Sequence, residues 1–506
     1  MIKVEDIEAI KPKFYRSESG GNKVEIQQKT FLDELDPRGH IINNPLIYEN
    51  IVKRIPRKDR NGEDMLDANG NMIFDYIEVP IERVSIPMQS VIKTKHVANI
   101  TANKLKFVHL SNNPSQEEKN SFIDFKNGWV TKNLETAKFE FADSIASVGD
   151  AAFCAIINKG KFRYRVFSIL NGDTLHPVFD DLGDVRVFGR GYTKYDYTKK
   201  ETVSCLDIWD DTNLTTFVSS SNNDSENKFD SFFWDEKDDF KLKIDANGID
   251  NSWEMVSSKR HGFERCPITY YQDPSGACWS NVQHLIENLE YALSQLGENN
   301  KSYAFRILAI KGGFEIQAED EGTRKGQARA ILLDENSDAK FLDKADASSS
   351  FELQLRTTLQ HILLGSFTVV PPEINGDISG VAVKILYSPA YEKGTEDVNK
   401  LNKSIDDIVS LFKFGYGLEL GQSAQFNKLN VRGDLTVFIP QNEYELTQIL
   451  TLGVQNKFIS IESAIDSCDR TSPDEVDRLT KQEKMLADME ANAARQQLVG
   501  TQEPLV

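Results

Sequence analysis

The chain has 506 residues, 40% of them hydrophobic, which is enough for a sizeable core and for more than one domain. Lys and Arg number 59 and Asp and Glu 78, so the net charge is −19. This excess of acidic residues excludes a protein that binds nucleic acid through a broad basic face. It is compatible with a protein past which nucleic acid slides without being held.

The cysteines and the apolar runs bear on compartment and membrane. The five cysteines are scattered and form no CxxC pair. They predict reduced thiols in a cytosolic compartment, with neither a disulfide framework nor a metal site. Residues 1–6 lack the apolar core of a signal peptide, and no apolar run approaches the roughly 20 residues of a membrane span, so we expect no membrane partner.

The N-terminal third changes from turns to helices. Residues 1–90 are polar and turn-rich, and the run 67–71 predicts a hairpin turn. A helix is expected to begin at Ser115, where Glu118 three residues on completes a capping box. A second helix is expected over 134–148, ending before a glycine.

Residues 151–219 alternate with period two and predict an antiparallel sheet, because no helices separate the strands. Two hairpins are expected, with turns at 158–161 and 198–201. The polar run 220–240 predicts a mobile loop.

The next segment reads as a helix, a small β module and a second helix. The first helix is expected to run from Ser280 to about Tyr303, with Gln283 completing a capping box. Residues 306–345 then predict short strands. The apolar stripe of this helix steps by four and three residues: Val282, Ile286, Leu289, Leu293 and Leu296.

The second helix is expected to start with a capping box of Ser349 and Glu352 and to end at Gly365. The loop 368–380 follows, in which two prolines fix the backbone and two glycines permit turns. A loop this apolar between two long helices is a poor linker, so we expect it to lie against something. The helix carries an apolar stripe of Phe351, Leu355, Leu359 and Ile362.

A longer helix then runs to about Gly417, with a kink expected at Pro389 and Gly394. A strand is expected at 435–439, followed by helices. The long helix has a single apolar face: Val398, Leu401, Ile405, Ile408 and Phe412. Caps or first turns of the later helices are expected at Asn442, Ser460 and Pro473.

The residues indicate no catalytic centre, metal site or cofactor. No phosphate-binding loop, HExxH or GxSxG motif occurs, and the seven histidines are dispersed. A basic cluster is equally compatible with a solvated loop tip and with a nucleic-acid or partner contact. It comprises Arg324, Lys325 and Arg329.

The order of these elements resembles the portal proteins of tailed bacteriophages, the head-to-tail connectors, and most of all those of long-tailed phages. The resemblance covers most of residues 95–490 and rests on this order more than on motifs. The short stretches that carry it are Arg265–Ile268, Asn375–Lys384, Phe458–Ile465 and Pro473–Leu479.

The resemblance implies an α+β fold with a wing containing an antiparallel sheet, a two-helix stem, a small β-containing clip, a long kinked wing helix and an α-helical crown. The implied division is 1–94 as an N-terminal region joined to the wing, 95–279 wing, 280–305 stem, 306–348 clip, 349–367 stem, 368–380 tunnel loop, 381–440 wing, and 441–506 crown and tail.

The resemblance also implies a structural role without catalysis, in a homo-oligomeric ring of twelve subunits at one capsid vertex of the virion, assembled in the host cytoplasm. Its implied partners are double-stranded DNA in the channel, the terminase large subunit, head-completion adaptors, and the major capsid protein or scaffold. The implied channel residues are Val369, Val370, Pro371, Pro372, Glu373, Ile374, Asn375, Gly376 and Asp377. The implied clip contacts are Lys311, Arg324, Lys325 and Arg329.

Two alternatives stand beside this reading. One is a ring adaptor or scaffold of a capsid or secretion assembly, without a DNA channel. The other is a carboxylate-dependent hydrolase with its site in 151–219, which predicts a deep pocket of convergent acids with shifted pKa values.

Overall fold

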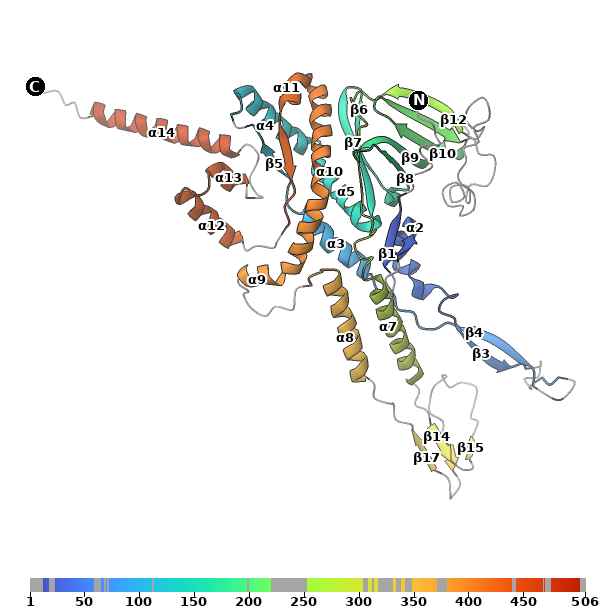
Figure 1. The fold of residues 1–506 in the computed structure, drawn as a ribbon. Helices are drawn as coiled ribbons and strands as arrows, with labels where there is room; N and C mark the ends of the chain where they lie inside the picture. Colours follow the sequence, from blue (N-terminus) through green and yellow to red (C-terminus); the bar gives the residue numbers. More distant parts are fainter. Residues whose placement is uncertain are drawn as a thin grey trace, which may run out of the picture.

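The computed structural model describes residues 12–17, 23–58, 65–67, 70, 72–111, 113–197, 200–219, 253–303, 308–311, 314–316, 331–333, 338–341, 348–370, 380–438, 443–466, 468 and 475–500. The chain is α+β. A mixed body carries two long helices, α7 (Gln283–Tyr303) and α8 (Ser348–Gly365), which extend from it side by side toward a small β region (Figure 1).

The N-terminal part supplies short strands and the first helices of the body. The hairpin expected around residues 67–71 forms between β3 and β4, with Leu66 bridged to Met72. The elements are β1 (Phe14–Ser17), β2 (Lys23–Ile26), α2 (Gln28–Leu35), η1 (Pro37–Gly39), η2 (Ile41–Asn43), β3 (Ile51–Pro56), β4 (Phe74–Val79), α3 (Met88–Thr101) and β5 (Lys106–His109).

Helices α4 (Gln116–Thr131) and α5 (Leu134–Val148) follow the sequence closely. The Ser115 hydroxyl accepts the Glu118 N–H at 3.2 Å, and the Glu118 carboxylate accepts the Ser115 N–H at 2.7 Å, so the predicted capping box is confirmed. Gly149 ends α5 in a left-handed conformation.

The two larger sheets of the body are antiparallel, and both predicted hairpins are confirmed. One sheet has the order β13-β6-β7 and the other β12-β11-β10-β9-β8. The run 220–240 lies outside the described residues. The strands are β6 (Asp150–Asn158), β7 (Lys161–Phe167), β8 (Thr174–Phe179), β9 (Val185–Asp196), β10 (Glu201–Trp209), β11 (Asn213–Ser219), β12 (Trp253–Arg260) and β13 (Ile268–Gln272), with the short helix η3 (Ile169–Asn171).

The largest core forms where α10 (Ser388–Leu420) packs against α4, α5 and the sheet of β6 and β7. Phe412 is fully buried and contacts the rings of Phe125, Trp129 and Phe162. All five residues of the predicted apolar face of this helix are buried, which confirms that face.

The two projecting helices are α7 (Gln283–Tyr303) and α8 (Ser348–Gly365). The short strands expected between them are present and pair as two antiparallel ladders, β14 with β17 and β15 with β16. They are β14 (Leu308–Lys311), β15 (Phe314–Ile316), β16 (Ile331–Leu333) and β17 (Asp338–Phe341).

Neither capping box predicted for these two helices forms. Ser349 lies inside α8, and the Glu352 carboxylate pairs with Arg356 one turn later, at 3.2 Å. The Ser280 hydroxyl has no hydrogen-bond partner among the described residues, because the chain turns over 277–282 before α7 begins.

The predicted kink of the long helix is displaced. The helix breaks at Tyr387, between α9 (Gly380–Leu386) and α10. Pro389 occupies the first turn of α10, where its missing N–H costs nothing. Gly394 lies inside α10 and admits Val437, whose methyl would be 2.7 Å from a Cβ at that position.

The prediction of a strand at 435–439 is wrong, because residues 435–438 form no strand. The strand is β18 (Val431–Asp434), paired with β5. Leu435 is buried in the core, and Phe438 donates its N–H to the carbonyl of Asn99 at 2.6 Å, so this apolar run fills space rather than extending a sheet. The remaining elements are α11 (Ser423–Lys428), α12 (Glu443–Gln455), α13 (Ile461–Asp466) and α14 (Glu475–Gly500).

Of the three helix starts predicted near the C-terminus, the one at Ser460 falls within the described residues. Ser460 accepts the Ser463 N–H at 3.1 Å and caps α13 as expected, whereas Asn442 and Pro473 lie outside the described residues. None of the five cysteines forms a disulfide. None of the described helices combines the length and the apolarity that crossing a membrane requires.

Candidate functional site at the end of helix α8

The end of α8 fixes the direction in which the chain enters the predicted tunnel loop. Phe367 adopts a left-handed conformation with φ of 54°. The Thr368 N–H donates to the Leu363 carbonyl at 2.9 Å and the Phe367 N–H to the Leu364 carbonyl at 3.1 Å. This is the Schellman pattern, with phenylalanine where glycine is usual, so the turn is held by its surroundings.

Two side chains from distant segments hold the last carbonyls of this helix. Asn281 donates to the Gly365 carbonyl at 2.6 Å, and His96 on α3 donates from Nε2 to the Ser366 carbonyl at 2.6 Å. Burial lowers the pKa of His96, so the ring is neutral with its proton on Nε2. The root of the loop is thereby tied to α3 and to the turn before α7.

Behind this root lies a cavity of about 240 Å³, bounded by α3, α5, α10, the turn before α7 and the end of α8. Four of its charged groups form two ion pairs: Lys393 is 2.7 Å from Asp397 and Lys400 is 2.6 Å from Glu396. The ammonium groups of Lys400 and Lys393 hold the pKa of Glu396 below its usual value. The cavity wall therefore carries two ion pairs and, in addition, the carboxylate of Asp273.

The predicted channel residues are only partly within the described chain. Val369 is half-buried and Val370 is 52% exposed, directly beyond the anchored turn. The other seven, Pro371 to Asp377, lie outside the described residues.

The predicted clip contacts are likewise mostly outside the described chain. Lys311 ends β14, but its side chain is not described, and Arg324, Lys325 and Arg329 are not described at all. Their roles stay predictions.

The acids of the 151–219 region do not converge on a described pocket. Arg190 donates to Asp173 at 2.6 and 2.8 Å and lies 3.8 Å from Asp207, and all three are buried. Burial raises the pKa of Asp173, and the Arg190 charge opposes that rise. The guanidinium also stacks on the rings of Phe167 and Tyr192, so the group is a packed ion pair.

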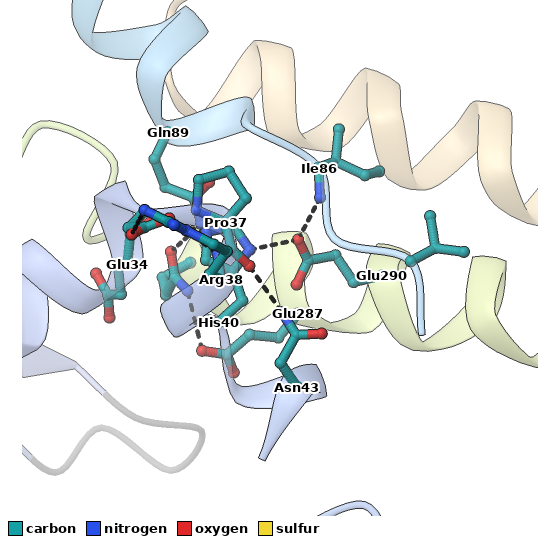
Figure 2. Close-up of polar contacts among 12 residues, drawn as sticks. Glu34, Pro37, Arg38, His40, Asn43, Ile86, Gln89, Glu287 and Glu290 are labelled. Atoms are coloured by element: carbon teal, nitrogen blue, oxygen red, sulfur yellow. Dashed lines mark hydrogen bonds and ion pairs between the residues drawn. The ribbon is translucent and has the colours of Figure 1, made fainter. Parts of the chain in front are cut away.

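A second region, not predicted from the sequence, joins the N-terminal segment to α7. His40 donates from Nε2 to the Glu34 carbonyl at 2.8 Å, and its Nδ1 lies 2.6 Å from Glu290 Oε1. Figure 2 shows Glu290 between His40 and Ile86, whose N–H donates to the same oxygen at 2.7 Å. Burial alone would lower the pKa of His40, but the hydrogen bond and charge of Glu290 outweigh it and raise the pKa.

The contact between Ile86 and Glu290 is the first of three, here called the ladder, in which a backbone N–H of the segment 82–86 donates to a side chain of α7. The N–H of Val84 donates to the Ser294 hydroxyl at 2.9 Å, and the N–H of Glu82 to the Glu298 carboxylate at 3.2 Å. Acceptors four residues apart on a helix rise about 6.0 Å, and alternate residues of an extended chain rise about 6.6 Å, so the two repeats nearly match. Acceptor side chains repeat every four residues on α7, at Glu290, Ser294 and Glu298. This repeat is the sequence signal that could have predicted the contact between the N-terminal segment and α7.

Among the described residues, no group of His, Cys, Asp and Glu could hold a metal ion. The site consists of the hydrogen-bonded end of α8 and a cavity with two ion pairs beside it, on an α+β scaffold with two projecting helices.

Comparison with known proteins gives the family. The family model described as "Phage portal protein, SPP1 Gp6-like" matches residues 77–489. The chain belongs to this phage portal protein family. No curated protein matches the chain. Among solved structures, a chain of the "Neck of empty GTA particle computed with C6 symmetry" is similar at 12% identity and a TM-score of 0.38, over 73% of this chain and 86% of that chain.

Proposed function

We propose that the chain is one subunit of a ring at a single capsid vertex, through which DNA is packaged and ejected. Residues 280–305 and 349–367 form the stem, 306–348 the clip, and 368–380 the tunnel loop. The remaining parts keep their expected roles: 1–94 and 95–279 with 381–440 as the wing, and 441–506 as the crown and tail. The ring has twelve copies, as the resemblance implies.

The observation that carries this proposal is the anchored end of α8. A left-handed residue and two distant side chains, His96 and Asn281, fix where the loop leaves the stem. A surface linker needs no such support, whereas a loop that meets a moving duplex does. The side-by-side helices that end at the small β region support the stem and clip assignments (Figure 1).

In this arrangement the loop contacts DNA sterically rather than through charge. With a net charge of −19 per chain, a ring of these subunits repels phosphate, so the duplex passes without being trapped. The clip, with Lys311, Arg324, Lys325 and Arg329, meets the terminase large subunit and later the head-completion adaptors.

Replacing residues 370–376 by a Gly/Ser segment of equal length tests the loop. We expect rings of normal mass, because the stem and wing are untouched, but capsids that lose DNase-protected DNA. The readouts are the mass of the purified ring, near twelve times the 57.2 kDa chain, and protected DNA in capsids complemented with each variant.

Leu182→Ser is the matched control, since this exposed side chain lies on a turn of the body between β8 and β9. Normal packaging by the loop variant would overturn the channel role and favour the ring adaptor without a DNA channel. A chain that stays monomeric in all conditions, with scaffold present, would overturn the ring itself.

A further inference from the structure

The ring of His40 is held between two hydrogen-bond acceptors in the interior of the molecule. Nε2 lies 2.8 Å from the Glu34 carbonyl oxygen, which has no proton to give, so Nε2 must carry one. Nδ1 lies 2.6 Å from Oε1 of Glu290, and that oxygen already accepts the N–H of Ile86 at 2.7 Å (Figure 2). Both ring nitrogens therefore donate, and the imidazolium form is the one in which histidine does so.

The positive charge of His40 offsets a buried negative charge. The side chains of His40 and Glu290 are each 2% exposed. If the imidazolium lost its Nδ1 proton, lone pairs of Nδ1 and Oε1 would face each other at 2.6 Å, and the Glu290 carboxylate would lose its counter-charge. Removing one charge of a buried ion pair is strongly destabilising, because the other charge stays buried and uncompensated. The contact therefore requires the proton on His40.

The same contact fixes a longer stretch of chain on α7. Glu290 accepts the first N–H of the ladder, so a change at Glu290 reaches the segment 82–86 directly. Arg83 in this segment donates to the Tyr48 carbonyl at 2.8 Å and to Asn50 Oδ1 at 2.9 Å. The segment thus also holds the stretch that leads into β3, and the base of the β3–β4 hairpin depends on it.

Two acids lie close to this pair and bear on how its titration is tested. Glu34 on α2 accepts two hydrogen bonds from Arg16 on β1, at 2.7 and 2.9 Å. Glu287 lies one turn before Glu290 on α7, and burial raises its pKa. Glu287 is therefore the acid whose titration an experiment must separate from that of His40.

The other charged and titratable groups packed around His40 keep one charge state between about pH 6.5 and 9. Asp36 pairs with Arg38 at the surface at 3.0 Å, and the hydrogen bond from Arg38 lowers the pKa of Asp36. The ring of Tyr48 lies 5.5 Å from that of Tyr291 on α7, and burial raises the pKa of Tyr48. The change of charge above neutral pH is thus that of His40.

We infer that His40 and Glu290 form a proton-dependent latch: protonated His40 holds Glu290 and the segment 82–86 in place on α7, and loss of that proton releases the segment and the base of the hairpin. The inference does not depend on the proposed ring. The family match begins at residue 77, so His40 belongs to a part of the chain that the family model does not cover.

The sign of the pH dependence follows from linkage. The pKa of His40 is raised in the folded chain by the hydrogen bond and charge of Glu290. The latch therefore contributes its full stability below about pH 6.5, the ordinary pKa of histidine, and loses it as the pH rises through the folded-state pKa. Between these two values one proton is released on opening, so the equilibrium constant for opening should rise about tenfold per pH unit and then level off.

The test is hydrogen–deuterium exchange of the full chain between about pH 6.5 and 8.5, read by mass spectrometry on peptides covering 82–86 and corrected with an unstructured reference peptide. Protection of these amides in the parent chain should fall with the slope given above. Glu290→Gln keeps an oxygen that accepts from Ile86 and an amide that donates to neutral His40, so its protection should not depend on pH. Glu298→Gln, the same substitution about two turns further along α7, is the matched control and should keep the parental pH dependence.

A second variant and a second readout do not rely on Glu290→Gln folding. His40→Gln keeps a neutral donor toward Glu290 and cannot titrate, so it should expose 82–86 equally at every pH, at the level that the parent chain reaches at high pH. Trypsin cleavage after Arg83, normalised to a small peptide substrate, should rise with pH in the parent chain alone.

Three results would overturn the latch. The first is parental exchange and cleavage that stay constant over this pH range. The second is a Glu290→Gln variant that keeps the parental pH dependence, which would assign the titration to Glu287. The third is exchange that changes only where mass photometry shows a change in the assembly state of the chain.

Discussion

At the scale of single residues, Asp150 is the most perturbed acid of the body. It begins β6 beside Gly149, has no exposed surface, and accepts hydrogen bonds from the Gln28 amide and from the Tyr270 hydroxyl at 3.0 Å. Burial outweighs both hydrogen bonds and raises the pKa of Asp150 to about 7. A carboxyl group without access to solvent cannot reach a substrate, so its protonation is a matter of stability.

The sign of that effect follows from linkage. Because the pKa of Asp150 is higher in the folded chain than the ordinary value of 3.8, the folded state holds the proton more tightly. Burial of Asp150 costs no folding stability below about pH 4, and the loss of stability grows as the pH rises toward 7. Above pH 7 the full cost is on the order of 4 kcal/mol.

We therefore predict that Asp150→Asn raises the melting temperature at pH 8 by several degrees and changes it much less at pH 5. The asparagine keeps both hydrogen bonds, since its oxygen accepts from Gln28 and its amide donates to Tyr270. Thermal melts followed by circular dichroism at the two pH values measure this. An equal shift at both would show that burial of the charge is not the cause.

At the scale of elements, the turn before α7 depends on close contact between the N-terminal segment and the body. Gly276 has φ of +77°, and a Cβ there would lie 2.2 Å from the ring of Phe31 on α2. Gly160, in the turn between β6 and β7, has nearly the same φ, +74°, but no atom within 4 Å of its Cβ position.

Gly276→Ala should therefore destabilise the chain by about 3 kcal/mol, and Gly160→Ala by about 1 kcal/mol. Both variants bear the left-handed conformation, but only the first also overpacks the core. Urea denaturation gives the two free energies of unfolding. Equal losses would mean that Phe31 moves aside freely and that α2 is loosely held.

Local patterns were enough to predict the elements whose ends are set locally. The bounds of α5 follow from its apolar period and from Gly149, and the β6–β7 hairpin from alternation around its turn. The start of α7 was missed because it is set by tertiary contacts. Trp279 is fully buried and donates to Glu34, so the chain must turn there before a helix can begin.

The same limit applies to the candidate site. Prolines and glycines identify the loop after Gly365, but His96 precedes the carbonyl that it holds by 270 residues. No spacing rule links such positions. The kink was predicted at Pro389 and Gly394 but lies at Tyr387, because Pro389 starts α10 rather than bending it.

At the scale of the whole molecule, the net charge of −19 predicts negligible affinity for duplex DNA in the absence of packaging partners. Fluorescence anisotropy with a labelled 30-base-pair duplex should detect no saturable binding at about 150 mM salt. Micromolar binding that weakens steeply with salt would contradict this and would require a basic surface along the channel.

The ladder of Ile86, Val84 and Glu82 on α7 has a built-in length. Its three donor–acceptor distances widen along the helix, 2.7, 2.9 and 3.2 Å. The repeat of the extended segment exceeds that of the helix by about 0.6 Å per step, so the mismatch between donors and acceptors grows along the ladder. The next alternate residue is Pro80, which has no N–H to donate, so the ladder ends at Glu82 and the segment is free to leave the helix there toward the hairpin.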